Sequence, residues 1–146
     1  MKIAIACDHA GYEIKEKLVG YLCAEGHEVK DFGTYSPESM DYPDTDHPMA
    51  AAVETGAYDF GIALCGSGNG MCMTVNKHRG IRGALCWDME IAWLARLHNN
   101  ANVCCLPARF LSYDEAQEIV ERFLMTDFEG GRHQRRIEKI PLPDVG

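Results

Sequence analysis

The sequence has no long apolar run, few basic residues and no cysteine spacing typical of a metal site. No stretch approaches the roughly 20 apolar residues that span a bilayer, so we expect a protein that does not enter a membrane. The 14 Lys and Arg against 22 Asp and Glu give a net charge of −8, which argues against nucleic acid as the general partner. The seven cysteines contain no C-x-x-C pair, so neither a zinc set nor a secreted disulfide framework is expected. These absences together predict a cytoplasmic protein.

The sequence has instead the pattern of one small α/β domain. Short apolar runs alternate with helical periodicity, and no repeat or Ser/Gly-rich linker suggests a second domain. The runs predict five strands, at 2–7, 28–32, 60–65, 83–87 and 102–106. Because the strands are apolar throughout, they predict a parallel sheet covered on both faces. We expect a single-domain, Rossmann-like three-layer α/β sandwich over residues 1–140, with a C-terminal helix and a tail at 141–146.

Several helix starts are indicated by capping residues, whose side-chain oxygens accept from free backbone N–H groups. Asp44 or Asp46 is predicted to cap the helix after the second strand, and Asp88 the helix after the fourth. Ser112 and Glu115 have the spacing of a capping box.

A ligand site is expected at the carboxyl ends of the strands, where open parallel sheets bind their ligands near the topological switch point. The groups that follow the predicted strands are Asp8-His9, Gly33-Thr34, Cys65-Gly66-Ser67, Asp88 and Pro107-Ala108-Arg109. The topology therefore gathers the reactive side chains among them on one edge of the sheet.

The strongest local signal is the glycine-rich turn 66–70, which follows a strand and precedes a helix. Its glycines leave backbone N–H groups uncovered for an anion. It is neither a P-loop nor a complete dinucleotide motif, because no Gly-Lys-Ser/Thr follows and Met71 stands where the third glycine would be. Cys65 directly precedes the turn, and a thiol at a helix N-terminus is expected to have a lowered pKa. It could act as nucleophile or base; the alternative is a structural turn beside a buried cysteine.

A second signal is the basic segment predicted as a last helix at 132–140. Arg132 and Arg136 are four residues apart, so they share a helix face, and two guanidinium groups suit a phosphate. A solvated basic face is the alternative. His98, near the end of an earlier helix, is either a cap or a functional residue.

Seven spaced motifs resemble one known family. They are Cys7-Asp8-His9-Ala10-Gly11, Asp41-Tyr42-Pro43, Cys65-Gly66-Ser67-Gly68-Asn69-Gly70, Asn76-Lys77, Gly80-Ile81-Arg82, His98-Asn99 and Gly130-Gly131-Arg132-His133. In order and spacing, from residue 2 to about 140, they resemble the ribose/galactose isomerase family, which includes ribose-5-phosphate isomerase B. The resemblance implies an aldose–ketose isomerase that needs neither cofactor nor metal and moves a proton between C1 and C2 through a cis-enediolate. It also implies a homodimer, or a dimer of dimers, with active sites shared between subunits.

The resemblance assigns roles to residues of this chain. Cys65 would be the base, because the glutamate that another branch of the family uses is replaced here by Met71. Ser67 would move the proton between O1 and O2, and His98 with Asp8 would open the sugar ring. The turn that stabilises the enediolate comprises Gly66, Gly68, Asn69, Gly70 and Met71. The phosphate would be held by His9, Arg109, Arg132 and Arg136, and the sugar hydroxyls by Tyr42 and Asn99.

Ribose 5-phosphate and ribulose 5-phosphate are the expected substrate pair. Two alternatives stay open at this point. The substrate could be a hexose 6-phosphate, of galactose or allose, or the chain could be a non-catalytic phosphate- or nucleotide-binding α/β module.

Overall fold

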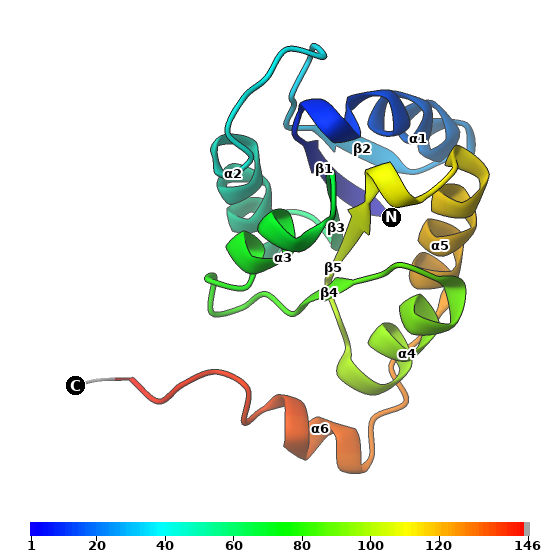
Figure 1. Ribbon diagram of the computed structural model, residues 1–146. Helices are drawn as coiled ribbons and strands as arrows, with labels where there is room; N and C mark the ends of the chain where they lie inside the picture. Colours follow the sequence, from blue (N-terminus) through cyan, green and yellow to red (C-terminus); the bar gives the residue numbers. More distant parts are fainter. Residues whose placement is uncertain (145–146) are drawn as a thin grey trace.

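Five parallel strands form one sheet in the order β2-β1-β3-β5-β4. The computed structural model describes residues 1–144 (Figure 1). The strands are β1 (Lys2–Cys7), β2 (Glu28–Asp31), β3 (Phe60–Cys65), β4 (Gly83–Leu85) and β5 (Val103–Pro107). Every neighbouring pair is parallel, so the prediction of a five-stranded parallel sheet is confirmed.

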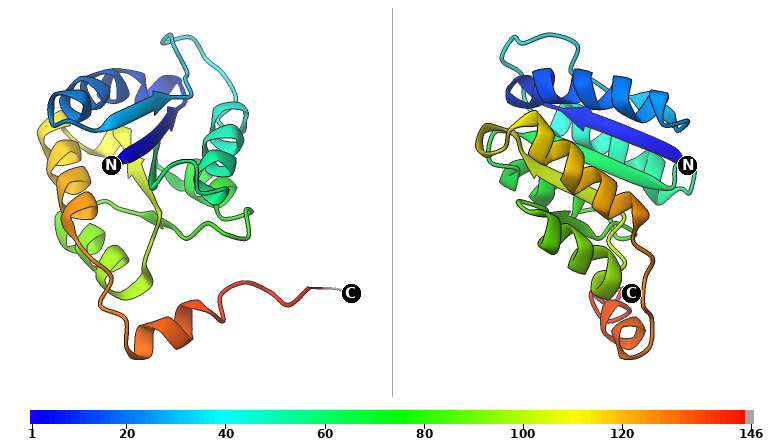
Figure 2. Two further views of the ribbon diagram at one scale, coloured as in Figure 1. Left: turned by 180° about the vertical axis from the view of Figure 1, so that it is seen from behind. Right: turned by 90° about the vertical axis from the view of Figure 1, so that its right-hand side faces the viewer.

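Helices cover both faces of this sheet, as Figures 1 and 2 show. One face carries α1 (Tyr12–Ala24), α4 (Met89–Asn99) and α5 (Tyr113–Met125), and the other carries α2 (Pro43–Glu54) and α3 (Asn69–Val75). The short 3₁₀ helices η1 (His9–Gly11) and η2 (Ala108–Phe110) follow β1 and β5, and α6 (Arg132–Ile137) packs against α4. The three-layer sandwich expected from the sequence is therefore present.

The two faces of the sheet have different cores. In β1, Ile3 and Ile5 join the cluster under α1, α4 and α5, which includes Phe123. Ala4 and Ala6 join the cluster under α2 and α3. All four strand residues are fully buried. Because successive side chains of a strand point to opposite faces, helices on both sides require apolar residues at every position.

The predicted caps are confirmed at two helices and wrong at one. Asp88 accepts a hydrogen bond at the start of α4, and Ser112 and Glu115 form both bonds of a capping box at α5. α2 instead begins at Pro43 without a side-chain cap, because proline fits the first helical position. Asp46 lies inside α2 and is completely buried. Its carboxyl faces the core rather than the free N–H groups.

Two elements, the last helix and the fourth strand, end earlier than the sequence predicts. α6 ends at Ile137 rather than near residue 140, and β4 ends at Leu85 rather than at residue 87. Residues 141–144 form neither helix nor strand, and 145–146 of the expected tail lie outside the described residues. The division into a domain at 1–140 and a tail stays a prediction. No helix in the described part of the chain is long and apolar enough to cross a membrane.

The sheet order places a switch point between β1 and β3. The chain leaves β1 for β2 on one side, and β3 pairs with β1 on the other. Open parallel sheets bind their ligands beside the carboxyl ends of the strands at such a point. Beside it, the buried Lys15 ammonium holds the following loop through Asp31 Oδ2 at 2.7 Å and the Thr34 carbonyl at 2.8 Å. Thr45 Oγ1 donates to the Cys7 carbonyl at 3.0 Å, which fixes the start of α2 at the carboxyl end of β1.

Candidate active site

Asp8 and Cys65 lie side by side at the switch point. Cys7 pairs with Leu64 across the two strands, and the Asp8 backbone N–H donates to the Leu64 carbonyl at 3.0 Å. Asp8 Oδ1 accepts from the N–H groups of Ala10 at 2.9 Å and Gly11 at 3.2 Å. These bonds hold a nearly buried carboxyl group, 6% exposed, next to the thiol.

The glycine-rich turn wraps around the sulfur of Cys65. The backbone N–H groups of Gly68, Gly70 and Met71 lie close enough to this thiol to lower its pKa. Gly68 makes the turn possible: its φ is +78°, and a Cβ there would lie 2.5 Å from Leu85 Cδ1. Only glycine satisfies both conditions. The turn therefore presents a cluster of backbone donors at the end of β3, as the sequence predicted.

The expectation of a lowered pKa for Cys65 is wrong in the single chain. Burial raises the pKa of this thiol, which is 5% exposed, and the nearby Asp8 charge raises it further. The N–H groups of Met71, Gly68 and Gly70 lower the pKa but do not outweigh burial. Removing a thiolate from water costs more than these backbone dipoles return.

Polar side chains surround this turn. The Tyr42 ring lies against Gly70, so close that a Cβ at residue 70 would be 2.5 Å from Tyr42 Cζ. The Arg109 guanidinium lies over Gly66, 3.1 Å from the position of a Cβ. His9 Nδ1 accepts from the Met40 N–H at 3.3 Å.

The mouth of the turn is formed by Ser67 and Asn69, which are both exposed. The Asn69 N–H donates to Ser67 Oγ at 3.3 Å. The structure thus brings together eleven of the predicted residues, which we call the cysteine group: Asp8, His9, Tyr42, Cys65, Gly66, Ser67, Gly68, Asn69, Gly70, Met71 and Arg109.

The other four predicted residues lie near the amino ends of the strands, opposite the cysteine group. We call them the arginine group: His98, Asn99, Arg132 and Arg136. His98 and Asn99 form the last turn of α4, just before β5 begins at Val103. Val103 pairs with Gly61, four residues before Cys65, which is about 13 Å along the strand. Within a single chain, the cysteine group and the arginine group therefore lie apart along the strands.

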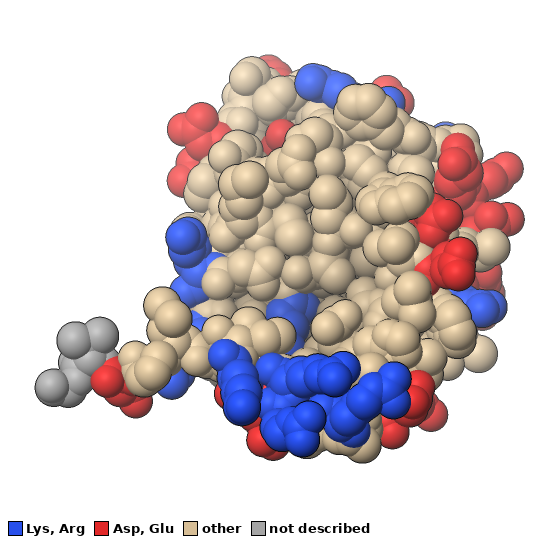
Figure 3. Space-filling view, turned by 60° about the horizontal axis from the view of Figure 1, so that its bottom comes forward, with Lys and Arg blue, Asp and Glu red and all other residues tan. Residues whose placement is uncertain are grey.

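Positive charge gathers around this second group. Figure 3 shows Lys and Arg side chains concentrated at the end of the molecule that carries α6. Arg132 and Arg136 belong to this helix, four residues apart as predicted, and both are exposed. An exposed pair of guanidinium groups one helical turn apart can hold a phosphate in two-point contact.

Two residues without a predicted role complete the arginine group. The rings of His98 and His133 are stacked, with centroids 4.3 Å apart and planes at 13°. Glu129 lies 3.9 Å from Nε2 of each ring. The sequence signal for this arrangement was the four-residue spacing of Glu129 and His133, beside the Gly130-Gly131 turn.

The same three residues have their ligating atoms within 4.8 Å of one another, so a metal ion must be considered. A metal binds an imidazole nitrogen in the plane of the ring, at about 2.0–2.1 Å for zinc. Nearly parallel rings stacked 4.3 Å apart cannot both contain one ion in their planes. Arg132 and Arg136 add positive charge nearby. This set does not fit a metal.

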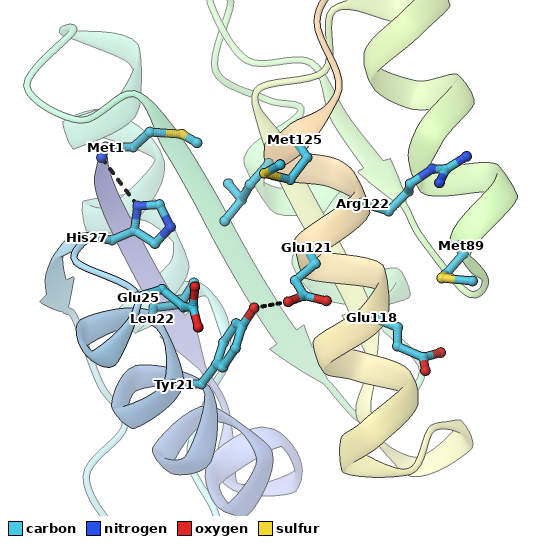
Figure 4. Close-up of a pocket in the computed structure, with 11 residues that line it drawn as sticks. Met1, Tyr21, Leu22, Glu25, His27, Met89, Glu118, Glu121, Arg122 and Met125 are labelled. Carbon is cyan, nitrogen blue, oxygen red and sulfur yellow. Dashed lines mark hydrogen bonds between the residues drawn. The ribbon is translucent and has the colours of Figure 1, made fainter.

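A separate hollow of about 540 Å³ lies between α1 and α5 (Figure 4). Its lining includes Met1, Leu22, Leu124 and Met125, and Tyr21 donates a hydrogen bond to Glu121 across it. No residue of the cysteine or arginine group lines this hollow. It is apart from the candidate active site.

Comparison with known proteins agrees with this geometry. A model of the Ribose/Galactose Isomerase family matches residues 3–140. The crystal structure of a ribose 5-phosphate isomerase from Thermotoga maritima has a TM-score of 0.94 and 53% identity, covering 96% of this chain and 97% of that chain. Ribose-5-phosphate isomerase B from Mycoplasma genitalium, solved with bound ribulose 5-phosphate, has a TM-score of 0.92 and 44% identity, covering 95% and 93%.

Two curated relatives agree as well. Ribose-5-phosphate isomerase B of Escherichia coli is 42% identical over 139 residues, 95% of this chain and 93% of the relative. D-erythrulose-4-phosphate isomerase of Pectobacterium atrosepticum is 41% identical over 142 residues, 96% and 93%. The chain therefore belongs to the ribose/galactose isomerase family of sugar-phosphate isomerases.

Proposed function

We propose that this protein is a cofactor-free aldose–ketose isomerase that interconverts ribose 5-phosphate and ribulose 5-phosphate in the cytoplasm. The observation that carries the proposal is the position of Cys65 beside the backbone N–H groups of Gly68, Gly70 and Met71, at the switch point of the sheet. Such donors stabilise the oxygen charge that develops when a proton leaves a carbon next to a carbonyl group. The relative from Mycoplasma genitalium, which binds ribulose 5-phosphate, supports the choice of substrate.

The proton transfer follows from the cysteine group. The Cys65 thiolate takes the proton from C2 of the open aldose, and the electrons form the C1–C2 double bond of an enediolate. The turn 66–71 stabilises the charged oxygen, and Ser67 exchanges a proton between O1 and O2 because a hydroxyl both donates and accepts. Cys65 then returns its proton to C1, which yields the ketose.

The reaction needs the phosphate to be fixed so that C1 and C2 lie at the thiol. We assign this to Arg132 and Arg136 with His9 and Arg109, and the sugar hydroxyls to Tyr42 and Asn99. His98, assisted by Asp8, opens the ring of the aldose. Because the arginine group lies near the opposite ends of the strands in its own chain, we propose that it serves the cysteine group of a second copy. The active unit is then a homodimer, or a dimer of such dimers, with two shared sites.

A shared site also accounts for the protonated thiol of the single chain. Burial and the Asp8 charge raise the pKa of Cys65. Two guanidinium groups from a second copy add positive charge, which favours the thiolate. The base would form only in the assembled site.

The function is tested by measuring turnover of ribose 5-phosphate by the purified protein without added metal or cofactor. Galactose 6-phosphate and allose 6-phosphate are measured in parallel, since hexose phosphates are the alternative substrates. We expect the highest kcat/KM for the pentose. A preference for a hexose phosphate would support the same mechanism with a different substrate. If none of the three sugar phosphates is isomerised, the alternative of a non-catalytic phosphate-binding module is favoured.

The shared site makes a prediction about mixed dimers. Arg132→Ala/Arg136→Ala is expected to raise KM for ribose 5-phosphate without unfolding the chain, since both side chains are exposed. Mixing it with Cys65→Ala and allowing the subunits to exchange creates dimers with one intact site. Half of the dimers are mixed, so activity at low substrate should recover to about a quarter of wild type, as two-fold symmetry requires.

Each variant mixed with itself is the control and should gain nothing. Native mass spectrometry of chains that carry different isotopes reports the extent of exchange. If exchange is complete and activity does not recover, both groups act within one chain or the arginine group does not bind the phosphate.

A further inference from the structure

The stacked histidines of the arginine group are held by a specific set of contacts. The Glu129 backbone N–H donates to the Leu97 carbonyl at 3.0 Å, which joins the loop after α5 to the last turn of α4. Gly130 and Gly131 then take φ values of +75° and +60°, which turn the chain back so that His133 reaches His98. The conformation of these two glycines therefore allows the imidazole ring of His133 to stack on that of His98.

The two rings have different surroundings. The side chain of His98 is 37% exposed, whereas that of His133 is 8% exposed. His133 Nε2 is buried and has no hydrogen-bond partner among residues 1–144. His98 can therefore meet a substrate, and His133 supports it from behind. Burial lowers the pKa of His133, and the neighbouring His98, Arg132 and Arg136 act in the same direction, whereas Glu129 raises the pKa without outweighing them. The neutral form of His133 is thus favoured, and His98 is the exposed ring of the pair.

Glu129 is the anion that faces both rings. Its carboxylate oxygens lie 3.9 Å from each Nε2, a distance at which a small movement creates a charge-assisted hydrogen bond. The other charged groups facing the pair are Arg132 and Arg136 of α6. Arg96 of α4 is turned away, because its guanidinium donates to the Thr126 and Ala101 carbonyls and to Asn100 Oδ1.

We propose that Glu129 and His133 are positioning residues that orient and charge His98 for ring opening. This inference rests on the proposed function. In that step the C1–O4 bond of the furanose breaks, O4 takes a proton from His98, the O1 proton goes to the Asp8 carboxylate and C1=O1 forms. Stacking on His133 fixes the plane of the His98 ring, and Glu129 holds the proton on it until O4 accepts it. Neither residue contributes to the later proton transfer at Cys65.

The test compares an aldose that has a ring with one that has none. Ribose 5-phosphate closes a furanose through O4, whereas O4 of erythrose 4-phosphate carries the phosphate and cannot. The D-erythrulose-4-phosphate isomerase among the relatives makes this tetrose a reasonable substrate. We expect Glu129→Gln to lower kcat for ribose 5-phosphate about tenfold, a part of the 10²–10⁴ that acid–base catalysis supplies, and to change kcat for erythrose 4-phosphate less than about twofold.

Two further variants separate this role from a loss of structure. His133→Ala should lower kcat for ribose 5-phosphate alone, and His133→Phe should recover part of it by keeping a flat ring beside His98. Glu138→Gln is the matched control. Its carboxylate, on the same segment, accepts from Gln134 Nε2 at 2.7 Å, and its loss should leave both substrates unchanged.

Equal losses on both sugars, or no loss on either, would overturn the positioning role. If the wild type does not accept erythrose 4-phosphate, deuterium exchange into C1 of ribulose 5-phosphate replaces it, because this ketose also has no furanose form. We then expect Glu129→Gln to exchange deuterium into ribulose 5-phosphate at the wild-type rate. If the exchange rate of this variant falls as much as its turnover of ribose 5-phosphate, the proposal is refuted. A wild type inactive on ribose 5-phosphate would instead refute the proposed function.

Discussion

Cys65→Ala is expected to abolish isomerisation while the protein keeps its fold. A positioned acid–base group contributes about 10²–10⁴-fold to a proton transfer, and Cys65 is the group that we propose as the base beside the N–H groups of the turn. The kcat for ribose 5-phosphate should fall by at least about a hundredfold. The loss of one sulfur atom from the core should cost only about 1 kcal/mol of stability. Both are measured on one preparation, by coupled assay and by urea denaturation.

Cys72→Ala is the matched control for this substitution. Cys72 follows Met71 in α3, and its thiol donates to the Gly83 carbonyl at 3.6 Å, so it has no proposed role in the reaction. Its loss should leave kcat near wild type. Substantial turnover by Cys65→Ala would mean that another group is the base, and equal losses in both variants would point to a general effect of thinning this core.

Asp46→Ala is expected to make the protein more stable. Asp46 is completely buried in α2, and neither oxygen of its carboxyl group has a hydrogen-bond partner within the described part of the chain. An unsatisfied buried polar group costs about 1–3 kcal/mol, and alanine also favours the helix. Urea denaturation at about neutral pH should therefore show a gain of about 1–3 kcal/mol, against the loss that most core substitutions cause.

The gain should depend on pH, because burial raises the pKa of Asp46 to about 8. The folded chain holds the proton up to that pH, whereas the unfolded chain releases it near pH 4. Wild-type stability relative to Asp46→Ala is thus greatest below about pH 4 and is lost as pH rises to about 8, by at most about 1.4 kcal/mol per unit. The advantage of the variant should grow between about pH 5 and about pH 8.

Asp44→Ala serves as the comparison, since Asp44 lies in the exposed first turn of the same helix. Its removal should lower stability by a few tenths of a kcal/mol through the helix dipole, without the same pH dependence. A stability difference between wild type and Asp46→Ala that stays constant with pH would show that Asp46 does not titrate in this range.

The amino-acid sequence by itself determined the layers of the fold and the turn around Cys65. Mostly apolar strands alternating with amphipathic helices indicate a parallel sheet covered on both faces, although β2, with the sequence EVKD, is polar at three of its four positions. The glycines at 66, 68 and 70 belong to a local turn, and local conformation can be derived from neighbouring residues. The same holds for the caps at Asp88 and Ser112. Spacing along one helix was also sufficient to place Arg132 and Arg136 on a common face.

Only the tertiary structure decided which of these residues can meet. The order β2-β1-β3-β5-β4 brings Asp8 to Cys65 at the carboxyl ends of neighbouring strands, and no local pattern specifies strand order. His98 lies at the end of α4, beside the amino end of β5, so one chain does not bring it to Cys65. Burial is likewise a property of the whole fold. Because of burial, the pKa of Cys65 is raised rather than lowered. Asp46 lies in the core rather than at a helix cap, and His133 lies behind His98. Pairwise contacts between distant segments set these environments, so local sequence patterns alone do not define them.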